Sequence, residues 1–327
     1  MVFRFYSYLS DYIICDNKTL SHITCYDAAV PRANKPKPDY LDAATAANTK
    51  LAYHKDLQRF VAWGGDIPST AAQVAAYIAS HGASHKPSTL ARWVASISQA
   101  HKIAGFDNPC GHIDVRRTLR GVRNAHGAKQ RHVAPAVRDE LVAMVKQLPS
   151  GLAGIRDRAV LLVGFAGALR RSELAKLEVK DVHFDVRGMI LSLGKTKTDQ
   201  AGEADEIAIP LAKGGYCPVR ALQAWLKAGG ISSGPIFRRI RKNGLVGPTG
   251  LAGFSIAQIV KASVARAGLD PALYSGHSLR AGLATSSAKE HKPFHKIKAQ
   301  TRHKSDVTLL RYIRDAELFE DNAADLL

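Results

Sequence analysis

The sequence predicts a two-domain protein: an all-α N-terminal domain, then a mainly α (α+β) domain that contains a small antiparallel sheet. Three observations lead to this fold class. A chain of 327 residues is long enough to bury two separate hydrophobic cores. Apolar residues follow helical spacing across residues 40–124, whereas short runs typical of strands occur between residues 182 and 209. A polar stretch without periodicity, residues 125–134, lies between them, and we interpret it as the linker.

The first 39 residues show little helical periodicity. They end in a segment rich in proline and basic residues, Pro31-Arg32-Ala33-Asn34-Lys35-Pro36-Lys37-Pro38. Such a composition favours an extended chain. We therefore predict an extended or disordered tail over residues 1–39.

The N-terminal domain, residues 40–124, is predicted to contain four helices. The third helix is the clearest, because it begins at a proline and ends at a glycine. Its mainly apolar face follows the 3.6-residue period and consists of Leu90, Trp93, Val94, Ile97 and His101. In the first, the expected apolar face is formed by Leu57, Phe60 and Val61. The predicted helices span, in order, Ala43–Trp63, Ser69–Gly82, Pro87–Gly105 and His112–Asn124.

The fourth helix carries many arginines. Its apolar side is formed by Val115, Leu119 and Val122, and the other sides carry Arg116, Arg117, Arg120 and Arg123. These guanidiniums could follow the phosphates of DNA or could form a solvated basic face. The chain has 46 Lys and Arg against 28 Asp and Glu, a net charge of +18, so we favour DNA binding.

The second domain is predicted to span residues 135–327. Pro135 begins a helix whose apolar stripe runs to Leu148, and a more completely buried helix covers Asp157–Ala168. Three strand-like runs follow, with a turn at Arg187-Gly188 between the first two: Val182–Phe184, Met189–Leu193 and Ile207–Ile209. Residues 195–204 form a polar loop, and apolar residues among acidic ones after Leu318 predict an amphipathic tail helix.

The net charge of +18 indicates a polyanionic partner. DNA is the simplest candidate, although RNA and membrane surfaces are also anionic.

No apolar run reaches the roughly 18 residues that a membrane-spanning helix needs, and the start lacks a signal-like core. We expect a cytoplasmic, nucleoid-associated protein with no membrane partner. Zinc and disulfide frameworks are not supported by the spacing of Cys15, Cys25, Cys110 and Cys217.

Several other motifs do not indicate function. Gly194-Lys195-Thr196 resembles the end of a nucleotide-binding loop, but Met189 stands where that loop needs glycine, so we expect no nucleotide. Gly247–Gly250 has the composition of a turn. The run Phe237–Lys242 could bind DNA or be the charged surface of a loop. We expect no metal at His291, His295 and His303, because lysines interleaved with the first two would repel a cation.

Five residues in the second domain suggest phosphoryl-transfer chemistry. Guanidiniums match the non-bridging oxygens of a phosphodiester with paired, permanently charged donors, and a tyrosine hydroxyl becomes a useful nucleophile when a neighbour accepts its proton. The candidates are Arg170, His277, Arg280, His303 and Tyr312. Each has an ordinary structural role when taken alone; the order and spacing of the set favour the functional interpretation.

This constellation resembles the tyrosine recombinase (phage integrase) family. The family's Gly-Leu-Arg-x-Ser-Glu-Leu box is similar to Ala168–Leu174 with Gly167 before it, which makes Glu173 the acidic partner of Arg170. Its His-x-x-Arg box matches His277 and Arg280, and its third box matches His303, nine residues before Tyr312. Where the family has Leu-Gly-His, this chain has Thr301-Arg302-His303, which adds a charge beside the site.

The resemblance implies the remaining expectations. A family lysine on a β-hairpin corresponds to Lys197, with Lys195 as the alternative. The four-helix domain would be a core-binding domain, and Tyr312 would form a 3′-phosphotyrosyl link without a cofactor. The expected partners are double-stranded DNA with inverted-repeat half-sites and three further copies of this chain, which together form a homotetramer.

Two alternative functions remain, a type IB topoisomerase-like DNA-relaxing enzyme and a catalytically idle DNA-binding regulator. The short core-binding domain and the tail helix favour a recombinase over the topoisomerase-like enzyme.

Overall fold

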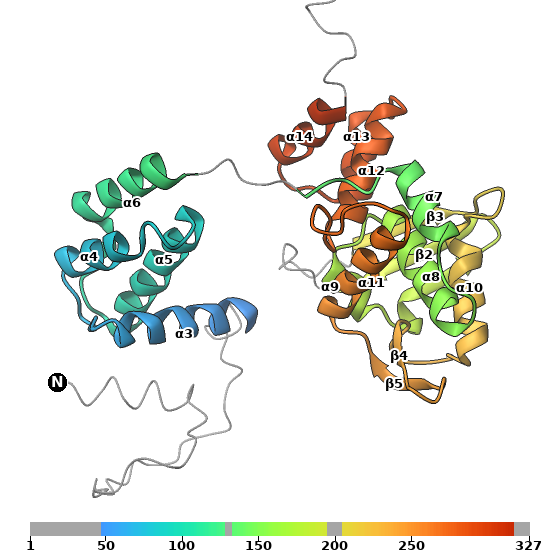
Figure 1. Ribbon diagram of the computed structural model, residues 1–327, viewed down its shortest axis with the longest axis horizontal. Helices are drawn as coiled ribbons and strands as arrows, with labels where there is room; N and C mark the ends of the chain where they lie inside the picture. The colour runs from blue at the N-terminus through green and yellow to red at the C-terminus, as the bar shows by residue number, and fades with distance from the viewer. Residues whose placement is uncertain (1–46, 128–132, 195–204, 317–327) are drawn as a thin grey trace, which may run out of the picture. The chain divides into compact units, whose positions relative to one another are not determined.

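The computed structural model describes residues 47–127, 133–194 and 205–316 (Figure 1). The chain divides into two compact units, Met1–Gln130 and Arg131–Leu327, and the boundary falls among the residues 125–134. The predicted tail of residues 1–39, the predicted loop over 195–204 and the predicted helix after Leu318 lie outside the described residues.

The described part of the N-terminal unit is all-α, which confirms the predicted class of this domain. Helix α3 packs against α5, and α4 packs against α6. Helix α6 continues two residues beyond the predicted end at Asn124 because nothing in that turn breaks the helix before Gly127. The helices are α3 (Ala47–Ala62), α4 (Ala71–His81), α5 (Pro87–Ala104) and α6 (Ile113–His126), with a 3-10 turn at Pro109–Gly111.

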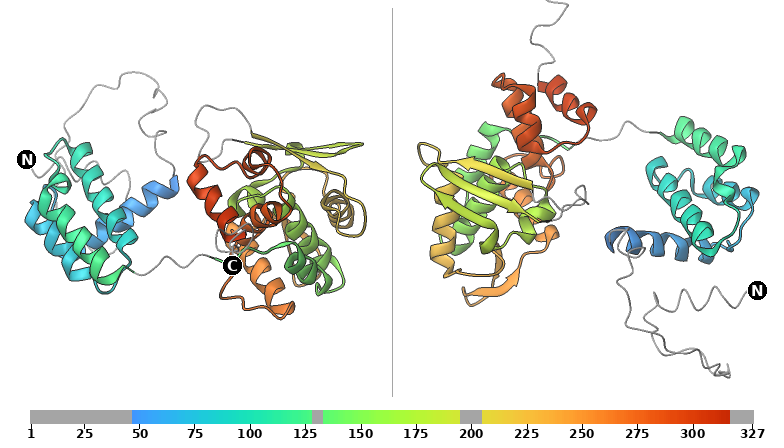
Figure 2. Two further views of the ribbon diagram at one scale, coloured as in Figure 1. Left: turned by 90° about the horizontal axis from the view of Figure 1, so that it is seen from above. Right: turned by 180° about the vertical axis from the view of Figure 1, so that it is seen from behind.

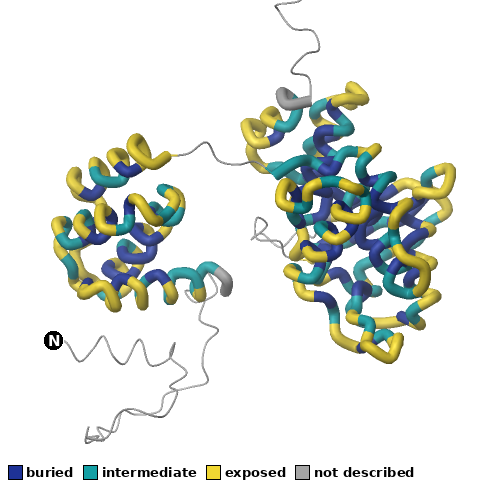
Figure 3. The backbone as a smooth tube through the Cα atoms, in the orientation of Figure 1, coloured by how far each residue is buried: buried dark blue, intermediate teal, exposed yellow. Residues whose placement is uncertain are grey.

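Aromatic rings form the centre of this unit. The ring centroids of Phe60 and Tyr77 are 5.0 Å apart, and those of Tyr77 and Trp93 are 5.3 Å apart. None of the three residues is more than 1% exposed, and Figure 3 shows the buried positions on the inner sides of the helices. Stacked and edge-on rings of this kind add favourable contacts to the area that they bury.

The predicted apolar face of the first helix is wrong at Val61, which is 58% exposed. An α-helix turns by about 100° per residue, so the side chain next to buried Phe60 points away from the core. The buried stripe passes through Asp56 instead, 2% exposed. Its carboxylate accepts hydrogen bonds from Nε and Nη2 of Arg92 at 2.8 and 2.9 Å, which compensates for its burial.

The described part of the second unit consists of helices and two small antiparallel sheets, again as predicted for its class. Helix α8 packs against both α10 and α12, and the three-stranded sheet forms a layer beside the helices (Figure 2). No described helix is long and apolar enough to cross a membrane. The helices are α7 (Arg138–Lys146), α8 (Leu152–Ala166), α9 (Arg171–Lys176), α10 (Pro218–Gly229), α11 (Gly253–Arg266), α12 (Ser278–Lys289), α13 (Phe294–Thr301) and α14 (Asp306–Ala316).

The three predicted strands are confirmed as β1 (Val182–Asp185), β2 (Gly188–Leu193) and β3 (Asp205–Pro210), in the antiparallel order β1-β2-β3. The turn between the first two lies one residue earlier than predicted, because Asp185 pairs with Gly188. Gly188 belongs to the strand, where a Cβ atom would lie 2.2 Å from the carbonyl oxygen of Ile209. Only glycine fits this close approach.

A second sheet corrects two sequence interpretations. The charged run Phe237–Lys242, for which a loop surface was one alternative, contains strand β4 (Arg238–Ile240). Gly247–Gly250, predicted to be a turn, belongs to strand β5 (Val246–Gly250), and the two strands pair antiparallel. A two-stranded sheet leaves one side of each strand without a partner strand, so a proline and glycines are tolerated there. Composition alone therefore favoured a turn where pairing produced a strand.

The start of the second unit is extended rather than helical, which corrects the predicted helix start at Pro135. Helix α7 begins at Arg138 because the preceding segment pairs with distant backbone. The amide of Ala134 donates to the carbonyl of Leu273, and that of Ala136 to the carbonyl of Ser278, both at 2.9 Å. This segment therefore lies along the start of α12, the helix that carries Arg280.

Candidate active site

Arg170 lies where the chain leaves α8 and enters α9. Between the helices, Ala168 has a φ of 44°, in the left-handed region. Glu173, in the first turn of α9, accepts hydrogen bonds from the backbone N–H of Arg170 at 2.9 Å and from its Nη1 at 2.5 Å. The carboxylate of Glu173 thus holds both the backbone and the guanidinium of Arg170.

Arg280, in the first turn of α12, is buried with 6% exposure. Its Nη1 donates to the carbonyl oxygen of Ala168 at 2.9 Å, and its Nη2 donates to that of Arg302 at 3.3 Å. Burial, and then the charges of Arg170 and Arg302, lower the pKa of Arg280 to about 10. A pKa of about 10 still leaves the guanidinium charged at neutral pH, as an anion-binding group must be.

Arg302 directly follows α13 as its C-terminal cap, and its φ of 52° is also left-handed. Its Nη2 donates to Oε2 of Glu173 at 2.9 Å and to the carbonyl oxygen of Ala168 at 3.4 Å. Burial alone would raise the pKa of Glu173, but Arg302 and the contacts from Arg170 outweigh burial and lower it. Glu173 is therefore an ionised carboxylate that two guanidiniums share.

The hydrogen bonds of Thr301 determine the tautomer of His303. The hydroxyl of Thr301 is 2.7 Å from the carbonyl oxygen of Ile297, an acceptor only, so the hydroxyl must donate there. Its oxygen then accepts from Nδ1 of His303 at 2.8 Å. Burial, and then Arg280, Arg170 and Arg302, lower the pKa of His303 to about 4. At neutral pH the ring is neutral, and its Nε2 is free to accept a proton.

Tyr312 lies on α14, half-buried against a small apolar cluster that includes Leu309 and Ile297. The ring centroids of His303 and Tyr312 are 5.9 Å apart. Tyr312 also lies close enough to Arg280 to influence its pKa. The tyrosine therefore lies beside a neutral proton acceptor and a buried cation.

His277 directly precedes α12, one turn before Arg280. The side chain reaches solvent, but the atoms packed around its ring, and then Arg171 and Arg280, lower its pKa. Arg171 packs tightly here: a Cβ atom at Gly276 would lie 3.0 Å from Cβ of Arg171. His277 is thus a second histidine whose neutral form is favoured.

The structure brings most of the predicted catalytic residues together. Contacts and charges link Arg170, Glu173, Arg280, His303 and Tyr312, and His277 lies near both arginines. Lys197 and its alternative Lys195 lie outside the described residues.

Sequence analysis did not assign a role to Arg302, which contacts Glu173 and Arg280. Its only signal was an arginine in a position where the family pattern has glycine.

The predicted DNA-binding arginines lie on α6 in the N-terminal unit. All four are exposed, while Val115 and Val122 of the same helix are buried. Among the residues that the structure describes, none forms an ion pair or a hydrogen bond with these guanidiniums. The four are Arg116, Arg117, Arg120 and Arg123.

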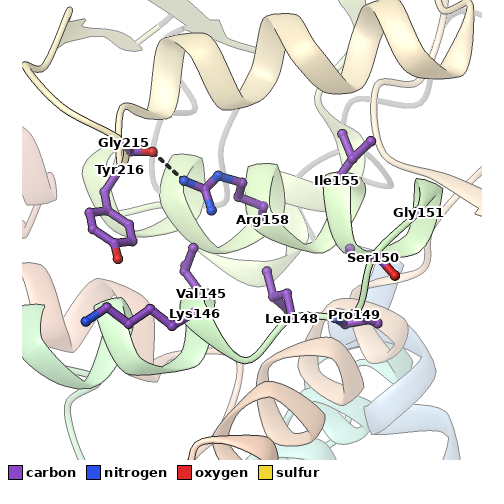
Figure 4. Close-up of a pocket in the computed structure, with 11 residues that line it drawn as sticks. Val145, Lys146, Leu148, Pro149, Ser150, Gly151, Ile155, Arg158, Gly215 and Tyr216 are labelled. Carbon is purple, nitrogen blue, oxygen red and sulfur yellow. Dashed lines mark hydrogen bonds between the residues drawn. The ribbon is translucent and has the colours of Figure 1, made fainter.

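An open groove of about 470 Å³ elsewhere in the second unit contains none of these residues. Lys146, Pro149 and Tyr216 line it together with Arg158, whose guanidinium donates to the carbonyl of Gly215 (Figure 4). Within the described ranges, no group of three His, Cys, Asp or Glu side chains could hold a metal ion. The catalytic candidates therefore do not line this groove.

Comparisons with known proteins agree with this arrangement. A model of the phage integrase family matches residues 137–318. The chain is 38% identical over 293 residues to an integrase/recombinase xerD homolog of Selenomonas ruminantium, covering 86% of each chain. It also resembles a lambda integrase tetramer bound to a Holliday junction, with a TM-score of 0.60, 17% identity and coverage of 86% of this chain and 77% of that one. For a Tn1549 transposon integrase bound to transposon right end DNA, the TM-score is 0.60, the identity 15% and the coverage 85% and 95%.

The family model covers more than half of the chain, and the xerD homolog is similar over most of it. The chain belongs to the phage integrase family of tyrosine recombinases. The structural likenesses, at less than 20% identity, concern the fold.

Proposed function

We propose that this protein is a site-specific recombinase that cuts and rejoins double-stranded DNA through a 3′-phosphotyrosyl intermediate. The observation that carries the proposal is the position of Tyr312 beside His303 and Arg280, with Arg280 linked to Arg170 through a shared hydrogen-bonded network. A nucleophile, a proton acceptor and anion-binding groups are the parts that transesterification of a phosphodiester needs.

In the proposed reaction, the Tyr312 oxygen attacks the scissile phosphorus and the bond to the 5′ oxygen breaks. Arg170 and Arg280 neutralise charge that builds on the non-bridging oxygens. Nε2 of the neutral His303 accepts the Tyr312 proton with the assistance of His277, and the protonated His303 ring then contacts the same phosphate. Lys197 protonates the departing 5′ oxygen. The 5′-hydroxyl of a second strand then reverses these steps, and because one phosphodiester replaces another, no energy source is consumed.

The proposed partner is DNA with inverted-repeat half-sites, bound by a homotetramer in the cytoplasm, at the nucleoid. The charge of +18 and the exposed arginines of α6 support a DNA partner. The lambda integrase structure is described as a tetramer on a Holliday junction, which supports the same assembly for a chain of similar fold.

The test uses a half-site selected by binding from a random duplex library and nicked near the cleavage position. Wild-type protein should become covalently trapped on this DNA, whereas Tyr312→Phe should bind it with unchanged affinity and form no adduct, because only the attacking oxygen is lost. An adduct with the Phe variant would show that the nucleophile is misassigned. Relaxation of supercoiled plasmids that lack the selected site would favour the topoisomerase-like alternative, and binding without cleavage by wild type would favour an idle regulator.

A further inference from the structure

Arg302 has a backbone conformation that arginine rarely adopts. Its φ of 52° is left-handed, where glycine is the usual residue, and the family pattern has glycine at this position. Its side chain is nevertheless 9% exposed and directed into the protein. A strained residue persists where the surrounding contacts hold it in place, and such residues concentrate at functional sites.

The contacts of Arg302 reach both arginines of the proposed phosphate site. Its Nη2 donates to Glu173, 2.9 Å away, and Glu173 holds the guanidinium of Arg170. Its carbonyl oxygen accepts from Nη2 of Arg280 at 3.3 Å. Both Arg302 and Arg280 also donate to the carbonyl oxygen of Ala168, at 3.4 and 2.9 Å. Arg302 therefore contacts both Glu173, the partner of Arg170 at the start of α9, and Arg280 in α12.

The charge around Arg302 is unbalanced. The guanidiniums of Arg170, Arg280 and Arg302 share one carboxylate, that of Glu173. The Nε and Nη1 atoms of Arg302 are buried, and neither has a hydrogen-bond partner among the described residues. Burying charged donors without partners is unfavourable, so an anion nearby would stabilise this arrangement.

We propose that Arg302 is a positioning residue of the active site: it holds Glu173, and through it Arg170, together with Arg280 in the arrangement that receives the scissile phosphate. This inference rests on the proposed function. A glycine at this position would favour the backbone conformation but could not contact Glu173. Arginine is strained at this φ, but unlike glycine it has a side chain that contacts Glu173, while its carbonyl accepts from Arg280.

The test is Arg302→Gly, measured by the single-turnover rate of adduct formation at saturating protein, by half-site affinity and by melting temperature. Relief of the left-handed strain should keep the melting temperature at or above that of wild type. Half-site affinity should stay within about threefold, because many other contacts bind DNA. Cleavage should slow by at least about tenfold, since misplacing groups that act on the transition state lowers its rate. Wild-type cleavage, or slow cleavage with a matching loss of melting temperature, would overturn the proposal.

His291→Gly provides a matched backbone control. His291 has a φ of 50°, is exposed, and lies on the turn between α12 and α13. This substitution relieves the same kind of strain and should leave cleavage unchanged. Arg302→Lys keeps a positive charge without the planar group. It should cleave faster than Arg302→Gly and more slowly than wild type, and a lysine variant as slow as the glycine variant would contradict the role of the charge.

A double-mutant cycle with Glu173→Gln tests whether Arg302 acts through Glu173. In the Glu173→Gln background, Arg302→Gly should slow cleavage by less than about threefold, since the contact is already weakened. Effects that multiply would show that the two side chains act independently and would refute the proposed route. Failure of the proposed function is a separate outcome: wild-type protein itself would then form no adduct.

Discussion

At the scale of single residues, the active site holds more positive than negative charge. Arg170, Arg280 and Arg302 surround Glu173, and the histidines beside them have lowered pKa values. Burial and this cationic cluster both raise the free energy of a protonated imidazole, which lowers the pKa of His303. This electrostatic arrangement suits a phosphodiester, whose charge both offsets the arginines and favours protonation of the histidine.

The lowered pKa of His303 predicts how stability depends on pH. The pKa is about 4 in the folded protein against 6.5 for a free histidine. The unfolded chain therefore binds more protons between these values, and the free energy of unfolding falls as the pH drops from about 6.5 to about 4. His303→Gln should make this decline shallower. Chemical denaturation at several pH values measures the difference, and curves with the same slope for both proteins would contradict the lowered pKa.

Replacing Arg280 should damage chemistry more than affinity. Arg280→Ala should slow cleavage by at least about 10²-fold, the scale for losing one donor that stabilises transition-state charge. It also leaves the carbonyls of Ala168 and Arg302 without this donor, so some stability is lost too. Arg280→Lys retains charge and serves as the control. Single-turnover cleavage and half-site binding measure the two effects, and a cleavage rate near that of wild type for Arg280→Ala would remove it from the phosphate site.

At the scale of elements, helix α6 presents a basic face. One face of this helix carries Arg116, Arg120 and Arg123, which are spaced by four and three residues. Arg117 points about 100° away from Arg116 around the helix axis. The double variant Arg116→Ala/Arg120→Ala should weaken DNA binding and reduce the slope of log affinity against log salt by about 2, since each phosphate contact contributes about 0.9.

Filter binding over a range of salt concentrations checks the prediction for α6. Arg138→Ala/Arg187→Ala removes the same charge and is the matched control. Both of those arginines are exposed and form ion pairs with carboxylates. Equal changes in slope for the two double variants would mean that overall charge, and not the face of α6, controls binding.

Helix α12 depends on a close approach of backbone. A Cβ atom at Gly282 would lie 1.9 Å from the carbonyl oxygen of Ala136, in the segment that enters the second unit. Gly282→Ala should therefore destabilise this unit by about 1–3 kcal/mol or more through overpacking. Gly121→Ala is the contrast, because its site on α6 is exposed and open, and alanine should stabilise that helix by about 0.5–1 kcal/mol. Thermal unfolding of both variants tests the pair, and an unchanged melting temperature for Gly282→Ala would show that the segment at Ala136 can move away from α12 at little cost.

At the scale of the whole molecule, each unit has its own hydrophobic core. One core includes Phe60, Tyr77 and Trp93, and the other surrounds α8 and includes Trp225. A chain of residues 131–327 should therefore fold alone and keep the Tyr312 chemistry, but bind a half-site more weakly because the α6 arginines are missing. Adduct formation at high protein concentration, with melting curves for the fragment, tests this. A fragment that fails to melt cooperatively would show that the two cores depend on each other.

The sequence by itself identified the residues of the candidate active site. Arg170 and Glu173 lie within one helical turn, His277 and Arg280 within another, and His303 precedes Tyr312 by nine residues. Helical periodicity and strand alternation likewise predicted the four N-terminal helices and the three-stranded sheet. These features are set by neighbours along the chain, so residue type and spacing are enough to reveal them.

Only the tertiary structure decided the contacts between distant segments. Glu173 accepts from Arg302, 129 positions away, and Asp56 accepts from Arg92, 36 positions away. Strands β4 and β5 pair where the sequence left a charged run unassigned and composition favoured a turn. The physical reason is that such contacts depend on how whole elements pack against one another, and packing can place a charged side chain beside any partner that compensates for its burial.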